Sequence, residues 1–211
     1  MTDALPSTDN SEDFWEQHYA KVTQASGGRP SAALVRYVDG RHLGRALELG
    51  CARGDDAIWL AKQGWAVTGV DVAQAALEAA RAAAKAAGVE SRTTFERHDL
   101  GETFPDGSFD LVVAMFLQSP VQFGRAQALR KAAAAVASGG LLLIAAHGSR
   151  APWSWADPDT VYPTARDELA DLALEADEWR EVFVGPIERE ARGTDGQRAT
   201  VIDTVVAMER Y

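Results

Sequence analysis

The chain has 211 residues, of which 46% are hydrophobic and 25% are charged, and its formal net charge at pH 7 is −10. These values are typical of one globular domain, and the acidic balance disfavours nucleic acid or an anionic membrane as a partner. The single cysteine, Cys51, excludes an intrachain disulfide and fits a reducing compartment. Because no run of about 18 apolar residues occurs, we expect a cytoplasmic protein without a membrane span.

The amino-terminal region divides into a polar tail and a helical entry segment. Residues 1–11 are rich in polar residues and predict a flexible tail, whereas residues 12–211 predict a single domain. A helix is expected over 12–22, with Trp15 and Tyr19 on one aromatic face, and a second helix is expected after Pro30.

From residue 45 onward, short apolar segments alternate with segments of helical spacing. Strands are predicted at 45–49, 66–70, 93–98, 109–116 and 141–146. Helices are predicted at 55–63, 73–87 and 125–137, with Gly139-Gly140 ending the last of them. Repeated strand-helix units predict a parallel, doubly wound sheet with right-handed crossovers.

The pattern changes after His147. Residues 148–163 hold Trp153 and Trp155 without a period, and so long a loop predicts a lid over a substrate. A helix at 164–175 is followed by two long strands, 178–190 and 198–210, which Gly193–Gly196 joins as a hairpin. We therefore predict an α/β, Rossmann-like fold, with a mostly parallel seven-stranded sheet ending in an antiparallel hairpin and helices on both faces.

A glycine turn follows the first strand, in the segment Glu48-Leu-Gly-Cys-Ala-Arg-Gly54. A dinucleotide cofactor requires G-x-G-x-x-G, because its pyrophosphate approaches the backbone closely, and this turn is G-x-x-x-G. A Walker loop is also absent. Asp71 and Asp99 end the next two strands, at the same sheet edge, so a nucleoside ligand without phosphates fits better.

The segment Glu48–Gly54 resembles the first motif of class I S-adenosylmethionine-dependent methyltransferases, usually E/D-x-G-x-G-x-G. Gly69-Val-Asp71-Val72 resembles the second motif, Arg97-His-Asp99-Leu100 resembles the adenine-binding segment, and Phe104–Val112 is similar to the approach to the fourth strand. Residues 14–19 and Gly28-Arg-Pro30 look like the tellurite-resistance and thiopurine-type branch, which acts on small molecules.

The resemblance implies S-adenosyl-L-methionine as cofactor and S-adenosyl-L-homocysteine as product. In it, Asp71 would accept from the ribose hydroxyls and Val72 would pack on the adenine. Asp99 would accept from the adenine amino group, and the Leu100 N–H would donate to a ring nitrogen. The implied cofactor residues are Glu48, Gly50, Cys51, Ala52, Gly54, Asp71, Val72, Asp99, Leu100, Ala114 and Met115.

One residue of the turn departs from the family pattern. The family's middle glycine is Ala52 here. If this position requires a positive φ, Ala52 costs about 1 kcal/mol; if it does not, the methyl group narrows the pocket.

Each candidate residue for binding the methyl acceptor also has an alternative role. Trp15, Tyr19, Arg29, Trp153 and Trp155 are the expected substrate-binding residues, although the aromatic residues also suit packing, and Arg29 suits a carboxylate of cofactor or substrate. His147 is the candidate general base, which only a hydroxyl acceptor would require. Cys51 suits a small buried residue, and no metal-ligand spacing occurs, so no metal is expected.

The sequence thus predicts a methyltransferase that moves a methyl group to an O, N, S or metalloid nucleophile of a small molecule. The expected partner is that acceptor alone, with no nucleic acid and no membrane, in a monomer or homodimer. A non-catalytic cofactor-binding protein is the first alternative, and a nicotinamide-dependent oxidoreductase is the second. The acceptor itself is not specified by the sequence.

Overall fold

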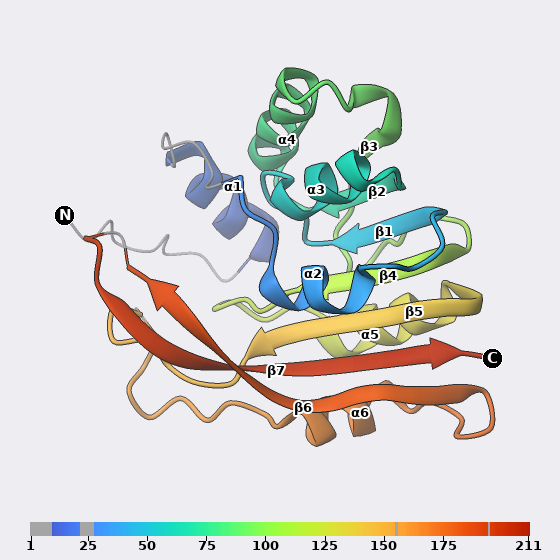
Figure 1. Cartoon of the computed structure of the whole chain (residues 1–211). Coiled ribbons are helices and arrows are strands. Elements are labelled where there is room, and N and C mark those ends of the chain that lie inside the picture. The colour runs from blue at the N-terminus through green and yellow to red at the C-terminus, as the bar shows by residue number, and fades with distance from the viewer. Residues whose placement is uncertain (1–9, 22–27, 155, 194) are drawn as a thin grey trace.

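The computed structural model describes residues 10–21, 28–154, 156–193 and 195–211. Most of the predicted tail, and Trp155, lie outside these residues. The described residues form one seven-stranded sheet with the order β3-β2-β1-β4-β5-β7-β6 (Figure 1).

Five parallel strands make the greater part of the sheet, and two antiparallel strands complete it. The parallel strands are β1 (Arg45–Leu49), β2 (Ala66–Asp71), β3 (Thr93–Arg97), β4 (Phe109–Met115) and β5 (Val136–His147). The antiparallel strands are β6 (Trp179–Arg192) and β7 (Arg198–Arg210), and β7 lies between β5 and β6. The predicted Rossmann-like fold class is confirmed.

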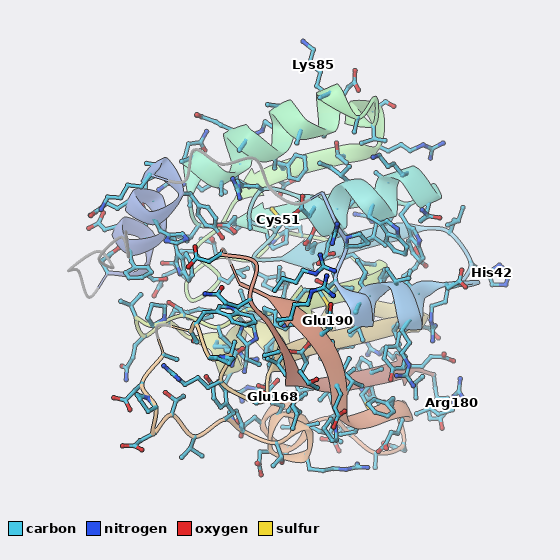
Figure 2. All side chains as sticks on the ribbon, turned by 60° about the vertical axis from the view of Figure 1, so that its left-hand side comes forward. His42, Cys51, Lys85, Glu168, Arg180 and Glu190 are labelled. Atoms are coloured by element: carbon cyan, nitrogen blue, oxygen red, sulfur yellow. The ribbon has the colours of Figure 1, made fainter. Side chains whose placement is uncertain are left out.

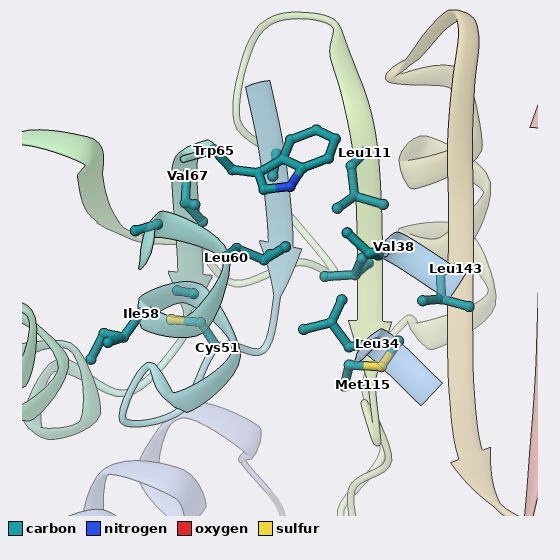
Figure 3. Close-up of a cluster of buried hydrophobic side chains, with 14 of the residues drawn as sticks. Leu34, Val38, Cys51, Ile58, Leu60, Trp65, Val67, Leu111, Met115 and Leu143 are labelled. Carbon is teal, nitrogen blue, oxygen red and sulfur yellow. The ribbon is translucent and has the colours of Figure 1, made fainter. Parts of the chain in front are cut away.

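Helices cover both faces of the sheet. They are α1 (Ser11–Lys21), α2 (Ala32–Val38), α3 (Asp55–Gln63), α4 (Gln74–Ala86), α5 (Arg125–Ala134) and α6 (Ala165–Leu172), with a short 3₁₀ turn at Glu90–Arg92. Strand residues alternate between two apolar clusters: Met115 packs with α2 and α3, whereas its neighbour Ala114 packs with α5. Figure 3 shows the first cluster, with Leu34 beside Met115 at the end of β4. A pleated strand buried on both faces explains the near-continuous apolar sequence of β4.

The predicted helix end at Gly139-Gly140 is wrong. The helix α5 stops at Ala134, and β5 begins at Val136, so both glycines lie within the strand. Pairing between β4 and β5 shifts register between Phe109 and Leu111, which is typical of a β-bulge. A Cβ on Gly140 would lie 3.0 Å from the Asp110 carbonyl oxygen, so the glycine allows this close backbone approach.

The last two strands project beyond the rest of the sheet at its carboxyl edge. Pairing between β5 and β7 ends at His147 and Asp203, whereas β6 and β7 remain paired as far as Arg192 and Arg198. Residues 188–192 and 198–202 therefore form a two-stranded arm that bends toward the side of α1 in Figure 1. None of the helices in the described ranges is long and apolar enough to cross a membrane.

Candidate active site

Two adjoining cavities lie at the carboxyl edge of β1, β2 and β4. Asp71, Val72, Asp99 and Leu100 line the first, which has an empty volume of about 570 Å³. The second is lined by Glu48, Gly50, Cys51, Ala52 and Met115, together with Arg29 and Arg53. Tyr19 and Gly50 belong to both walls, so the two cavities meet at the glycine turn. This edge is where open α/β sheets bind their ligands.

Asp71 is fixed by backbone groups at the end of β2. Its Oδ2 accepts from the Ala52 N–H at 2.9 Å, and its Oδ1 accepts from the Ala73 N–H at 3.0 Å. The residue is 7% exposed, and burial raises the pKa of its carboxyl group. Each carboxylate oxygen has a second lone pair, which leaves capacity for a hydroxyl donor in the cavity.

The backbone of the turn shows that position 52 requires a positive φ, the first of the two possibilities for Ala52. Ala52 adopts a φ of 48°, in the left-handed region, and this conformation directs its N–H toward Asp71. The expected cost of about 1 kcal/mol therefore applies. Gly50 also has a positive φ, of 65°, and a Cβ there would lie 2.7 Å from Leu117 Cδ1. A side chain at Gly50 would thus intrude on the boundary between the two cavities.

Acids and arginines both line the second cavity. Glu48 is 4% exposed, and its Oε2 has no hydrogen-bond partner among the described residues. Burial, and then the charge of Asp56, raise its pKa well above the usual value. Asp56 is held by Ser31, whose N–H and hydroxyl lie 2.5 Å and 2.6 Å from its two carboxylate oxygens. A cavity lined by an unsatisfied carboxylate oxygen and by two arginines suits a ligand that carries both an ammonium and a carboxylate.

The helix α1 packs across the mouth of the first cavity. The Trp15 indole N–H donates to Ser119 Oγ at 3.2 Å, and the Glu16 carboxylate accepts from the Ala75 N–H at 3.2 Å. Tyr19 stacks on Trp15, and burial, followed by the charge of Asp71, raises the pKa of its hydroxyl. A neutral tyrosine hydroxyl beside Asp71 adds a donor to the cavity wall.

A third group of side chains lies next to the first cavity, at the ends of β5, β6 and β7. Phe116 follows β4 with a φ of 57°, lines the first cavity and stacks on His147 with ring centroids 4.6 Å apart. Left-handed backbone at a phenylalanine is strained, and such strain is concentrated at functional sites. The Arg189 guanidinium lies over the Phe116 ring, 5.4 Å from its centroid, and also pairs with Asp203.

Several predicted residues lie elsewhere. The Ala114 side chain is fully buried in the cluster against α5 and lines neither cavity. Gly54 ends the glycine turn with a φ of 80° and caps α3. Trp153 packs on Gly193 in the turn of the hairpin rather than lining either cavity.

Burial raises the pKa of the Cys51 thiol well above its usual value, which makes it a poor nucleophile.

Among the residues that the structure describes, no three His, Cys, Asp or Glu side chains are grouped to hold a metal ion. The sequence did not single out Arg53, Asp56, Phe116, Arg189 or Asp203. Only Asp203 carried a readable signal, as a carboxylate within the apolar run of β7.

Comparison with known proteins agrees with this geometry. Residues 46–140 match the model of a family described as a methyltransferase domain. The methyltransferase GfsG of Streptomyces halstedii is 33% identical over 123 residues, which are 57% of this chain and 44% of GfsG. A 2-heptyl-1-hydroxyquinolin-4(1H)-one methyltransferase of Mycobacteroides abscessus is 27% identical over 179 residues, 78% of this chain and 76% of that protein. The chain thus spans less than half the length of GfsG.

Two solved structures share the fold. One comes from work on the conversion of a disulfide bond into a thioacetal group during echinomycin biosynthesis; it has a TM-score of 0.73 and 22% identity, covering 95% of this chain and 92% of the other. TehB from Haemophilus influenzae has a TM-score of 0.67 and 14% identity, covering 95% and 67%.

The fold is Rossmann-like, and residues 46–140 match a methyltransferase-domain family. S-adenosyl-L-methionine is the cofactor expected in this family.

Proposed function

We propose that the protein is a methyltransferase that moves the methyl group of S-adenosyl-L-methionine to a hydroxyl group of a small molecule. The observation that carries the proposal is the pair of joined cavities, one with Asp71 at a strand end and the other lined by both acids and arginines. This combination suits a nucleoside joined to an amino acid, and it offers no loop for a pyrophosphate.

We expect the cofactor to occupy both cavities. Asp71 would accept from the ribose hydroxyls, and Val72 would pack on the adenine. Asp99 would accept from the adenine amino group, and the Leu100 N–H would donate to a ring nitrogen. Glu48 Oε2, which has no partner in the described part of the chain, would gain one from the cofactor ammonium. Arg29 and Arg53 line the cavity where the cofactor carboxylate would lie.

When bound, the cofactor supplies an already activated methyl group, so the protein contributes chiefly by holding the acceptor in line with it. Met115, the last residue of β4, and Tyr19 both line the second cavity, where part of the cofactor would lie. Residues 148–163 and the arm of β6 and β7 would enclose the acceptor. Trp15, Trp153 and Trp155 stay candidates for that wall.

A small-molecule acceptor is supported by two observations. The net charge of −10 opposes binding to nucleic acid. One relative, matched over 78% of this chain, acts, by its name, on a hydroxyquinolinone. We infer that this chain belongs to the small-molecule, tellurite-resistance and thiopurine-type branch, with the acceptor as its only partner.

Transfer of a labelled methyl group tests the proposal. The purified protein would be incubated with S-adenosylmethionine labelled in the methyl group and with separate pools of phenols, N-hydroxy heteroaromatics, thiols, amines and tellurite. We expect label in a hydroxyl-bearing product, with equal formation of S-adenosylhomocysteine. Transfer to thiols or tellurite alone would reject the hydroxyl class, and cofactor binding without transfer to any pool would favour a non-catalytic binding protein.

A further inference from the structure

A buried charge that the cofactor site does not use lies in β7, opposite the carboxyl end of β5. Asp203 is 2% exposed although it lies in an otherwise apolar strand. Its Oδ2 accepts from Arg189 Nε at 2.5 Å, while its Oδ1 has no hydrogen-bond partner among the described residues. A buried carboxylate oxygen without a donor is costly, by about 1–3 kcal/mol, so its retention calls for a reason.

The side chain that faces this oxygen is His147. His147 Nδ1 lies 3.9 Å from Asp203 Oδ1, and the two residues are directly paired across β5 and β7. The separation is longer than a hydrogen bond, but catalytic contacts commonly shorten only once the substrate is bound. The His147 side chain is 48% exposed, so the ring is open to solvent on part of its surface.

His147 also lies on the correct face of the sheet. Leu143 and Ala145 precede it at alternate positions of β5 and belong to the apolar cluster that includes Met115, as Figure 3 shows for Leu143 and Met115. Because strand side chains alternate, His147 continues the same row beyond Ala145, at the edge where the cavities open. Its ring stacks on Phe116, which is part of the first cavity wall.

The arm of β6 and β7 also borders His147. Ile187 of β6 pairs with Asp203 and packs on the same cluster, and Arg189 follows two residues later on that face. Glu190, the next residue, marks the position of the arm in Figure 2. His147 is therefore bordered by Phe116, by the Asp203–Arg189 pair and by solvent, which is the setting of a group that contacts an entering acceptor.

We propose that Asp203 is a positioning residue for His147, and that His147 Nε2 takes the proton of a hydroxyl acceptor. This inference rests on the proposed function for its acceptor. Arg189 holds one oxygen of Asp203, the other accepts from Nδ1–H, and the ring then presents an unprotonated Nε2. As the acceptor O–H passes its proton to Nε2, the new O–CH₃ bond forms and the CH₃–S bond of the cofactor breaks, leaving S-adenosylhomocysteine; the proton then leaves His147 for solvent.

The arrangement predicts which ring nitrogen carries the proton, and this can be measured without any acceptor. Nitrogen NMR of the ¹⁵N-labelled full chain distinguishes the two neutral forms of each of its four histidines. The His147 signals are assigned as those missing from the H147Q spectrum. We expect the Nδ1–H form for His147 in the wild-type protein.

Asp203→Asn supplies the sharpest comparison. Its amide oxygen would stay with Arg189, so its NH₂ would face His147 Nδ1 and force the proton onto Nε2. We expect the Nδ1–H form in the wild type and the Nε2–H form in D203N. Glu190→Gln is the matched control, because Glu190 also pairs with an arginine on the arm, Arg198 at 3.2 Å; it should leave the His147 form unchanged. The Nε2–H form in both wild type and D203N would overturn the proposal, whether or not the protein proves to be a methyltransferase.

A series of acceptors of graded acidity provides the kinetic test. For hydroxyls that are neutral at the assay pH, we expect H147Q and D203N to lower kcat by about 10²–10⁴-fold, the usual contribution of a positioned base. For acceptors that are already anions, both variants should keep kcat within about threefold of wild type, because no proton has to be removed. Equal losses with every acceptor would show that the pair is only structural and would overturn the assignment.

Discussion

The cofactor side and the acceptor side of this molecule are built in different ways. The central part of the cofactor side is a turn and two strand ends within residues 48–100, and its acid Asp71 is held by backbone N–H groups. The acceptor side brings together Phe116, His147, Arg189 and Asp203, which lie on four strands or their ends, and its acid is held by an arginine. Local geometry therefore determines the first site, whereas the register of an antiparallel pair determines the second.

This difference has a physical consequence. Backbone groups are in place whenever the turn and strand have formed, so the cofactor side tolerates the loss of a side chain elsewhere. A buried ion pair depends on both partners, because the loss of one leaves an uncompensated charge. We therefore expect changes on the acceptor side to affect folding as well as turnover, and changes on the cofactor side to affect affinity chiefly.

The largest effect on stability is expected from the Arg189–Asp203 pair. Arg189→Met leaves the buried Asp203 carboxylate without its cation and should lower the free energy of unfolding by about 3–5 kcal/mol. Urea denaturation measures this loss. Adding Asp203→Leu to that variant should restore most of the lost stability, because no buried charge is then left. If Arg189→Met is as stable as wild type, the acceptor side is not held by this pair.

A smaller and different effect is expected from Asp71. Asp71→Ala removes the acceptor for the ribose hydroxyls and should weaken binding of S-adenosylhomocysteine by about 1–3 kcal/mol, the range for a lost charge-assisted hydrogen bond. Titration calorimetry measures the change, with Asp106→Ala, in an exposed turn, as the control. Unchanged affinity in D71A would show that this acid does not contact the cofactor.

Glu48 allows a test through pH. Its folded pKa is raised above the ordinary value of 4.5, so between those two values the folded protein binds more protons than the unfolded chain. The stability of the protein free of cofactor should therefore fall as pH rises above 4.5. Glu48→Gln carries no such proton and should flatten this slope, raising stability at pH 7 by about 1 kcal/mol, the scale of one unsatisfied buried group. Thermal unfolding at pH 5 and pH 7.5 checks both effects; parallel curves for wild type and E48Q would contradict them.

The smallest effect is expected at Ala52. Ala52→Gly removes the strain of a left-handed alanine, worth about 1 kcal/mol, but increases the freedom of the unfolded chain by a comparable amount. The free energy of unfolding should rise by less than about 1 kcal/mol, while the affinity for S-adenosylhomocysteine stays the same or improves. A loss of stability would mean that the positive φ of Ala52 carries no strain.

Most of the fold could be predicted from the sequence, because strand and helix periods alternate clearly up to β5. The end of α5 was mispredicted, since two glycines served a bulge instead of ending a helix. On the cofactor side, Asp71 and Asp99 were readable because parallel strands bring their carboxyl ends to one edge. Arg189 and Asp203 were not readable as a pair, because their approach depends on the register of the hairpin. Phe116 gave no signal, since nothing in its neighbours indicates a positive φ.

The central claim is that the joined cavities bind a phosphate-free nucleoside joined to an amino acid. Titration calorimetry of the wild-type protein with S-adenosylhomocysteine and, separately, with NAD tests it most directly. We predict saturable binding of one S-adenosylhomocysteine per chain and no heat of binding with NAD. Saturable binding of NAD with no response to S-adenosylhomocysteine would contradict the claim.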